Sequence, residues 1–172
     1  LNEMIKPGLI GYGRWGKIVH EKLIQISEVV FVSDTKRSYE DKLDLVDWVV
    51  VCSSNKSHYS IVRDCLNSGK NVFCEKPLTE SLAQAKELFN LAKKMDVKLY
   101  VSDIQNYRDI YYPIKKENFI SRTKKSKADI IDILFNLTYH DVYLIYDSVK
   151  GKNISNVKVI DKKQTLNFTV YF

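Results

Sequence analysis

A glycine-rich hexapeptide stands between a short apolar run and a segment of helical periodicity, residues 14–26. It fits the pattern GxGxxG, and its residues are Gly11, Tyr12, Gly13, Arg14, Trp15 and Gly16. In such a pattern the first glycine permits a tight turn, the second lets backbone approach a pyrophosphate, and the third allows close packing of helix on strand. The helix N-terminus then offers free N–H groups and a positive dipole end to phosphates. This context predicts a dinucleotide site with the pyrophosphate at residues 12–15.

An acidic residue, Asp34, ends the next strand about 20 residues further on, where dinucleotide folds place a carboxylate that accepts hydrogen bonds from the adenosine ribose. This carboxylate repels a 2′-phosphate and favours NAD. Lys36 and Arg37 follow it closely. A cation there could neutralise the phosphate and admit NADP, while a solvated loop explains the same two residues equally well. We therefore expect NAD as the cofactor, with NADP as the alternative.

The tripeptide Glu75-Lys76-Pro77 ends another apolar run, residues 72–74. A solvated turn is one explanation, because proline cannot donate to a sheet ladder and charge prefers water. A catalytic lysine is the other. Ligands of open parallel sheets bind at the carboxyl ends of strands, and Pro77 fixes the backbone directly after Lys76. Burial and a nearby cofactor charge could lower the pKa of Lys76 toward neutrality, as a general base requires.

The first hundred residues alternate strand and helix signals. Strands are predicted at 29–34, 48–53, 71–74 and 98–103, and helices at 14–26, 57–68 and 82–95. Gly69 has the position of a C′ glycine, and Ser81 with Gln84 that of a capping box. This alternation predicts an α/β fold, a Rossmann-type doubly wound parallel sheet, over residues 1–104. Only twelve residues separate Asp34 from Asp47, near the minimum for a parallel crossover.

The pattern changes after residue 104. Residues 115–127 are basic and polar, and a solvated loop explains them, because no aromatic interleaving or nucleic-acid motif accompanies the lysines. A long helix is expected at 133–149 and a hairpin at 154–172. Residues 105–172 thus predict a reduced α+β appendage, a truncated substrate or oligomerisation domain. Because an apolar edge hairpin is an association liability, we expect residues 154–172 to pair with another copy in a homo-oligomer.

The composition sets the broad class. The 172 residues fit one domain, or one domain with a small appendage, and 45% of them are hydrophobic. A net charge of +6 indicates affinity for anions, which include nucleic acid, a membrane surface and phosphorylated small molecules. The three cysteines lack the close pairs of a zinc site, so no metal is expected, and their odd number favours a reducing compartment. With no stretch of transmembrane length and no visible leader, we expect a cytoplasmic protein without nucleic-acid or membrane partners.

Four stretches occur in the order of the Gfo/Idh/MocA oxidoreductases, which they resemble: GLIGYGRWG, DWVVVCSSNKSH, SGKNVFCEKPLT and NLTYHDVYLI. The resemblance spans roughly residues 5–146, and the EKP element is its most specific part. It implies hydride transfer between a nicotinamide and a hydroxyl-bearing carbon of a sugar, nucleotide sugar or cyclitol. It also implies that Lys76 lies beside the nicotinamide, that the Lys76–Pro77 bond is often cis, and that the cofactor is lined by Cys52, Ser53, Ser54, His58 and Glu75. For His58, a place in the first turn of a helix is the plainer alternative.

The stretch NLTYHDVYLI resembles the family's Asp-x-x-x-His helix, whose two side chains share one helical face. Here the two positions are Asn136 and His140, and an amide can orient a substrate hydroxyl but cannot carry charge. The resemblance implies that Lys76 takes the proton of the substrate hydroxyl and that His140 holds or relays from the same hydroxyl. Some relatives use a tyrosine instead, so Tyr107 and Tyr139 are the alternative catalytic residues. Most of the family's large second domain has no counterpart here. A non-catalytic dinucleotide-binding sensor or scaffold is therefore the alternative function.

Overall fold

The computed structural model describes residues 4–104, 117–123, 139–140, 142–143, 155–162 and 165–171. The chain forms two compact units, which we call unit 1 (Leu1–Ser102) and unit 2 (Asp103–Phe172). Unit 1 carries a parallel sheet with helices, and unit 2 carries an antiparallel sheet.

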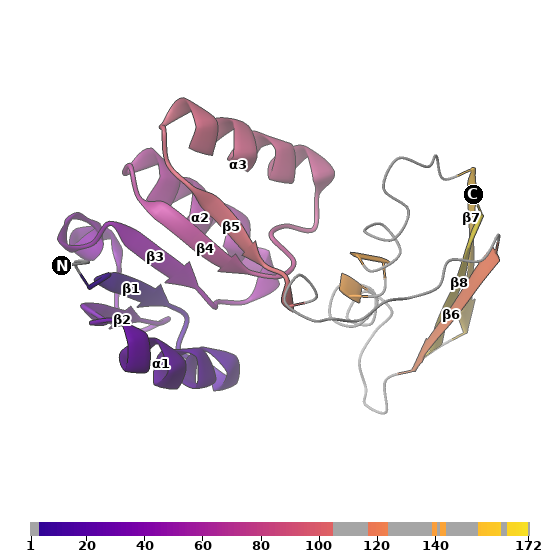
Figure 1. Cartoon of the computed structure of the whole chain (residues 1–172), viewed down its shortest axis with the longest axis horizontal. Coiled ribbons are helices and arrows are strands. Elements are labelled where there is room, and N and C mark those ends of the chain that lie inside the picture. The colour runs from indigo at the N-terminus through magenta and orange to yellow at the C-terminus, as the bar shows by residue number, and fades with distance from the viewer. Residues whose placement is uncertain are drawn as a thin grey trace. The chain divides into compact units, whose positions relative to one another are not determined.

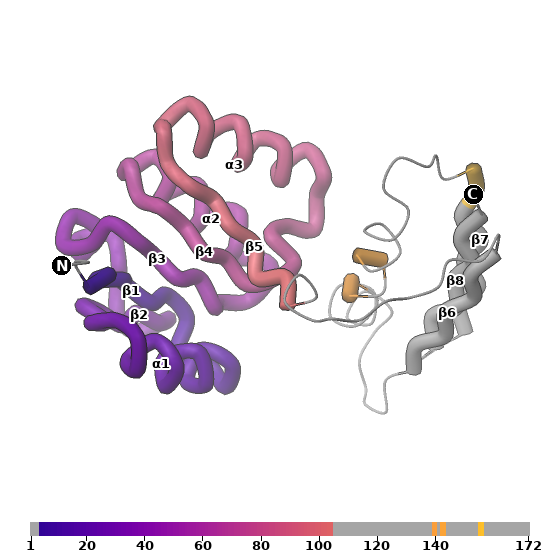
Figure 2. The backbone as a smooth tube through the Cα atoms, in the orientation of Figure 1, coloured from indigo at the N-terminus to yellow at the C-terminus, as the bar shows by residue number. Residues whose placement is uncertain are grey.

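Unit 1 is built on five parallel strands that pair in the order β2-β1-β3-β4-β5 (Figure 1). Their bounds are Pro7–Ile10 for β1, Phe31–Ser33 for β2, Trp48–Val51 for β3, Asn71–Glu75 for β4 and Leu99–Ser102 for β5. The central strands are continuous apolar runs, because both faces of a parallel sheet are covered. The predicted doubly wound parallel sheet is confirmed, and Figure 2 traces its strands side by side.

Three α-helices cover the two faces of this sheet: α1 Arg14–Ile26, α2 Asn55–Asn67 and α3 Leu82–Lys94. Figure 1 shows α1 on one face and α2 and α3 on the other. Alternate strand residues therefore join different cores. Leu9 and Val50 pack with residues of α1, whereas Val49 and Val51 belong to the larger cluster under α2 and α3. Among the described residues, no helix is both long and apolar enough to span a membrane.

The connection from β2 to β3 contains a short 3-10 helix, η1 Glu40–Leu45, in place of an α-helix. It passes β1, which lies between β2 and β3 in the sheet. Leu43 and Val46 bury it in the core under α2 and α3, and the hydroxyl of Tyr39 donates to Asp64 of α2 at 3.1 Å. The winding thus reverses between β1 and β3. Ligands of open α/β sheets bind at such a switch point, outside the carboxyl ends of the strands.

The helix ends follow the local sequence signals with one difference. Gly69 follows α2 with a φ of +71°, as a C′ glycine does. Ser81 caps α3, since its side chain accepts a hydrogen bond from the N–H of Gln84. The N–H of Ser81 donates to the side chain of Thr79 at 3.2 Å, so Thr79 takes the place that the capping box assigns to Gln84.

Unit 2 contains a three-stranded antiparallel sheet in the order β6-β8-β7, with β6 at Glu117–Thr123, β7 at Asn156–Lys162 and β8 at Thr165–Tyr171. Strands β7 and β8 form the hairpin expected within 154–172. The expectation of a solvated loop over 115–127 is wrong for residues 117–123, because this segment pairs along the second edge of β8. The long helix expected at 133–149 lies mostly outside the described residues, of which 139–140 and 142–143 are helical.

Candidate functional site

The three glycines after β1 have different structural roles. Gly11 has a φ of +100°, and a Cβ there would overlap backbone at the end of β3. A Cβ at Gly16 would overlap the carbonyl oxygen of Gly11, so α1 rests directly on the turn. A Cβ at Gly13, by contrast, would meet nothing within 4 Å. Packing therefore accounts for Gly11 and Gly16, whereas Gly13 borders open space that a ligand could enter.

The first turn of α1 presents backbone N–H groups to the same open space. Gly13 is the N-cap and has no side chain to satisfy them, and the first turn contains no acidic residue. Arg14 and Trp15, which follow Gly13, are exposed. The turn is tied to the sheet, since the N–H of Gly11 donates to the carbonyl of Ser33 at 2.8 Å. Uncapped N–H groups, a positive dipole end and a nearby arginine together fit an anionic pyrophosphate.

Asp34 lies directly beyond β2 in a tight turn of its own. Its Oδ1 accepts from the N–H of Lys36 at 2.9 Å, and its Oδ2 accepts from Nη2 of Arg37 at 2.7 Å. These bonds, the one from Arg37 above all, lower the pKa of Asp34 to about 2. The group is thus a carboxylate at neutral pH. Its side chain is 28% exposed, so lone pairs remain within reach of a ribose hydroxyl.

The end of β3 brings serine hydroxyls together at the start of α2. Ser57 Oγ lies 2.9 Å from Ser53 Oγ and 3.1 Å from Ser54 Oγ, and Ser54 is the N-cap of α2. Sequence reasoning named Ser53 and Ser54 but missed Ser57, whose place three to four residues further, within one helical turn, was the available signal. Cys52 belongs to the core. Burial raises the pKa of its thiol to about 12, so the thiol stays protonated and faces packed side chains.

His58 was expected on the wall of the cofactor site, but the structure buries its ring, which is only 1% exposed. Its Nδ1 lies 2.8 Å from the carbonyl oxygen of Pro77, and its Nε2 lies 3.1 Å from the carbonyl oxygen of Ser53. Both ring nitrogens thus face backbone. His58 therefore joins the turn after β3 to the turn after β4.

Glu75, Lys76 and Pro77 follow the end of β4, next to the end of β3 in the sheet. The Lys76–Pro77 bond is cis. Lys76 is half-buried, and this burial lowers the pKa of its amine from the usual value, although Glu75 partly opposes the shift. The direction of the shift favours the neutral amine, which is the form that accepts a proton.

In unit 2, His140 and Tyr139 lie in a short helical segment with their rings in edge contact, 5.7 Å between centroids. The hydroxyl of Tyr139 donates to Oδ2 of the buried Asp103 at 3.4 Å. Burial and this carboxylate raise the pKa of Tyr139 to about 12, so its phenol stays protonated at neutral pH. Asn136 and Tyr107, which the sequence also singled out, lie outside the described residues.

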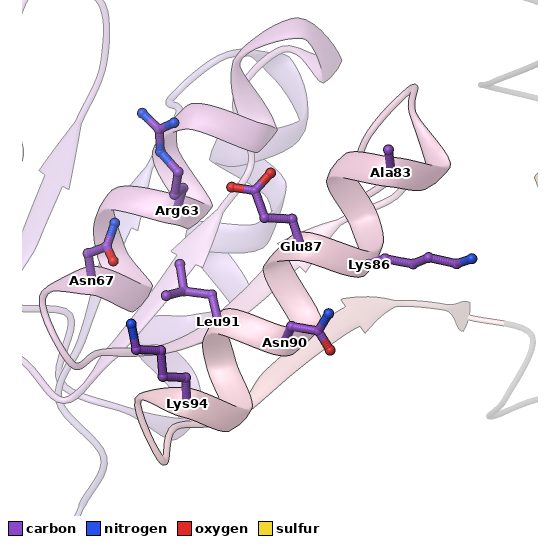
Figure 3. Close-up of a pocket in the computed structure, with 8 residues that line it drawn as sticks. All are labelled: Arg63, Asn67, Ala83, Lys86, Glu87, Asn90, Leu91 and Lys94. Atoms are coloured by element: carbon purple, nitrogen blue, oxygen red, sulfur yellow. The ribbon is translucent and has the colours of Figure 1, made fainter.

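A surface hollow lies between α2 and α3 (Figure 3). Its lining residues are Arg63, Asn67, Ala83, Lys86, Glu87, Asn90, Leu91 and Lys94. All of them belong to the two helices, and none is a predicted site residue. This hollow is therefore no part of the candidate site at the strand ends.

Known proteins resemble this chain in both sequence and fold. The family model "Oxidoreductase family, NAD-binding Rossmann fold" (GFO_IDH_MocA) matches residues 20–103, a stretch that includes Asp34, His58 and Lys76. Myo-inositol 2-dehydrogenase of Thermotoga maritima is 35% identical over 117 residues, which cover 56% of this chain and 35% of that protein. Inositol 2-dehydrogenase/D-chiro-inositol 3-dehydrogenase of Lactiplantibacillus plantarum is 28% identical over 76% of this chain and 43% of its own length.

A solved structure, UDP-N-acetylglucosamine 3-dehydrogenase from Acidithiobacillus ferrooxidans, matches 98% of this chain and 70% of that chain with a TM-score of 0.78; at 19% identity it supports the fold alone. The fold is of the NAD-binding Rossmann type, and the relatives are oxidoreductases. Residues 20–103 thus match the Gfo/Idh/MocA oxidoreductase family, and the relatives named above are inositol and nucleotide-sugar dehydrogenases. The chain spans well under half the length of the curated relatives named above.

Proposed function

We propose that this chain binds NAD(H) or NADP(H) across the carboxyl ends of β1, β3 and β4 and that it oxidises a hydroxyl-bearing carbon of a sugar, nucleotide sugar or cyclitol. The observation that carries the proposal is that the candidate residues lie together at the carboxyl ends of neighbouring strands. The open glycine turn, the serine hydroxyls and the half-buried Lys76 all follow strands that are parallel and adjacent. The carboxyl ends of parallel strands meet at the same edge.

The residues at this edge divide the binding work. The N–H groups of the first turn of α1 and the side chain of Arg14 hold the pyrophosphate beside Gly13. Asp34 accepts a hydrogen bond from the adenosine ribose. The space between the pyrophosphate and Lys76 is lined by Ser53, Ser54 and Glu75. The buried ring of His58 holds the turns that carry these residues, through its contacts with two backbone carbonyls. The bound dinucleotide supplies the hydride acceptor at its nicotinamide ring.

Lys76 acts as the general base in this proposal. When a carbinol carbon loses hydride, its hydroxyl must lose a proton, and the neutral amine of Lys76 accepts it at Nζ. General acid–base help of this kind contributes about 10²–10⁴-fold to a rate. The lowered pKa of Lys76 supports the role, since it makes more of the neutral amine present at a given pH. The resemblance to the family's helix implies that His140 and Asn136 orient a substrate hydroxyl.

The proposal has a test in two parts. Dinucleotide binding is measured by calorimetry, and turnover is then followed as absorbance of the reduced nicotinamide with a panel of sugars, nucleotide sugars and cyclitols. Binding together with turnover on one of these classes supports the dehydrogenase. Binding without turnover across the panel supports a sensor or scaffold that uses the same fold. Absence of binding contradicts both functions.

We also propose that unit 2 carries the contact between copies of this chain. Its sheet has the order β6-β8-β7, so β6 and β7 are edge strands among the described residues. An edge strand presents unpaired N–H and C=O groups, which pair readily with another chain. The pairing surface is therefore the edge of β7 or of β6, within residues 117–123 and 154–172.

A further inference from the structure

Arg37 is held against Asp34 by a closed turn. Backbone hydrogen bonds run both ways between the two residues, from Asp34 N–H to Arg37 O at 3.2 Å and from Arg37 N–H to Asp34 O at 3.1 Å. The guanidinium adds its bond to Oδ2, and the N–H of Lys36 takes Oδ1. From the sequence, Arg37 could be either a functional cation or part of a solvated loop. The structure holds its guanidinium beside the carboxylate of Asp34.

The aromatic ring of Tyr12 contacts two cationic side chains, those of Arg37 and Lys17. Cζ of Arg37 and Nζ of Lys17 each lie 5.8 Å from the centre of this ring. Tyr12 belongs to the glycine turn, and Arg37 belongs to the turn after the adjacent strand β2. Lys17 of α1 and Arg37 thus approach the same ring, and Lys36 shares the turn of Asp34. These three cations favour an added anion beside Asp34.

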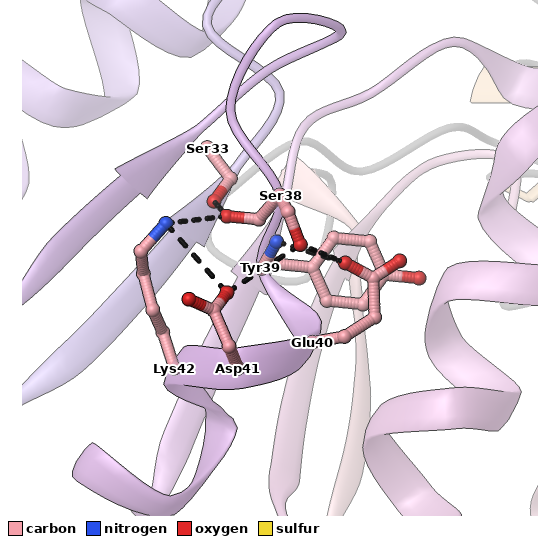
Figure 4. Close-up of polar contacts among 6 residues, drawn as sticks. All are labelled: Ser33, Ser38, Tyr39, Glu40, Asp41 and Lys42. Atoms are coloured by element: carbon pink, nitrogen blue, oxygen red, sulfur yellow. Dashed lines mark hydrogen bonds and ion pairs between the residues drawn. The ribbon is translucent and has the colours of Figure 1, made fainter.

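The segment after Arg37 stiffens this turn (Figure 4). The hydroxyl of Ser33, at the end of β2, donates to the carbonyl of Ser38 at 2.8 Å, and Nζ of Lys42 donates to the same carbonyl at 2.6 Å. Ser38 also contacts Glu40 through its hydroxyl. The chain is thereby bonded on both sides of Arg37, so the guanidinium stands on a fixed loop, which reduces the ordering cost of binding a ligand.

We infer that Arg37 sets the choice of dinucleotide and that this chain binds NADP(H) at least as tightly as NAD(H). The inference rests on the proposed function, which places the adenosine ribose at Asp34. A bare carboxylate there repels a 2′-phosphate, but here Arg37 neutralises it, and the bond to Oδ2 occupies one of the five guanidinium donors. The remaining donors suit a phosphate, which arginine binds in a forked geometry. The positive charges of Lys17 and Lys36 add electrostatic attraction for the 2′-phosphate.

The test is calorimetric titration of NADP⁺ and NAD⁺, at one ionic strength, into the wild-type chain, Arg37→Gln and Lys36→Gln. Lys36→Gln is the matched control, because it removes a charge from the same turn while the backbone bond from residue 36 to Asp34 remains. We expect Arg37→Gln to weaken NADP⁺ by about 10-fold or more, the scale of a lost charge-assisted bond, and to change NAD⁺ by less than about threefold. Lys36→Gln should weaken NADP⁺ much less than Arg37→Gln does.

A second variant changes Asp34, the other member of the ion pair with Arg37. Asp34→Asn removes the negative charge and one of the two acceptor oxygens, which weakens the bonds to the ribose and to Arg37, so NAD⁺ binding should weaken while NADP⁺ binding holds or tightens. The inference is overturned if wild-type protein binds NAD⁺ clearly more tightly than NADP⁺, or if Arg37→Gln weakens both dinucleotides equally. In either case NAD⁺ binding by the wild type leaves the proposed function standing. Binding of neither dinucleotide overturns the proposed function and the inference together.

Discussion

At the residue scale, one type of residue serves two purposes within six positions. Gly11 and Gly16 are required by packing, because a Cβ at either would overlap backbone. Gly13 is not required by packing, and the proposed approach of a ligand accounts for it. The sequence pattern predicted a tight turn at Gly11, the approach of a pyrophosphate at Gly13 and close helix packing at Gly16. The structure separates the glycines that build the turn from the glycine that leaves room beside it.

This separation predicts that two alanine variants differ in their free energy of unfolding. Alanine is intrinsically better than glycine in a helix by about 1 kcal/mol, yet Gly16→Ala should lower the free energy of unfolding by about 1–3 kcal/mol, since its Cβ meets a carbonyl that cannot move away cheaply. Gly13→Ala should change it by less than about 1 kcal/mol. Urea unfolding followed by circular dichroism measures both. Equal losses in the two variants would refute the distinct roles.

Lys76 has a testable chemical role at the same scale. Lys76→Ala should keep dinucleotide affinity within a small factor and lower turnover by about 10²-fold or more, the scale of a lost general base. Because burial lowers its pKa, the wild-type rate should rise with pH through a pKa below the usual lysine value, and this limb should be missing in the variant. The measurement is a pH profile of turnover beside a binding titration. A variant with unchanged turnover would return Lys76 to the role of a charged strand end.

At the element scale, His58 links two turns that approach the site from neighbouring strands. Ser53 follows β3 and Pro77 follows β4, and the ring nitrogens lie within 3.1 Å of both carbonyls. A carbonyl oxygen only accepts, and a neutral imidazole carries a single N–H, so the neutral ring can donate to one of them at a time. The tautomer decides which of the two carbonyls, that of Pro77 or that of Ser53, accepts it.

Removing the His58 side chain should lower the stability of unit 1. His58→Ala leaves two carbonyls without their side-chain partner and opens a cavity in the core, which should cost about 2–5 kcal/mol of unfolding free energy. Lys56→Ala, an exposed change on the same turn of α2, is the control and should cost less than about 0.5 kcal/mol. Chemical denaturation of both variants decides the matter. A loss in His58→Ala no larger than in the control would show that the two contacts carry no weight.

Sequence reasoning succeeded where the signal was local. The strands of unit 1, the helix caps and the acidic end of β2 all depend on residues within one turn or one alternation. It failed for residues 117–123, whose partner strand begins more than 40 positions later and whose flanking lysines resemble a loop. It left His58 between the wall of the cofactor site and the first turn of a helix, because its burial depends on α2 packing against the ends of β3 and β4. The pairing of Arg37 with Asp34 needed the closed turn, which the letters alone did not distinguish from a free loop.

At the scale of the whole molecule, each unit has a separate task in our account. Unit 1 contains every residue that we assign to dinucleotide binding, and unit 2 contains His140 and the edge strands. If the edges of unit 2 pair between copies, the chain should form dimers or larger oligomers in solution. Light scattering coupled to size-exclusion chromatography, over a wide range of concentrations, measures this. A monodisperse monomer at high concentration would contradict the proposed contact.

The central claim is that a nicotinamide dinucleotide binds on the open side of Gly13. The most direct measurement is calorimetric titration of NADP⁺ and NAD⁺ into wild-type protein and into Gly13→Val, with unfolding curves for both. The Cβ of a valine there would meet nothing within 4 Å, and the side chain would block the approach of the pyrophosphate to the backbone. We predict binding to the wild type, no measurable binding to Gly13→Val, and unfolding curves that nearly coincide. Undiminished binding in a folded Gly13→Val variant would contradict the account.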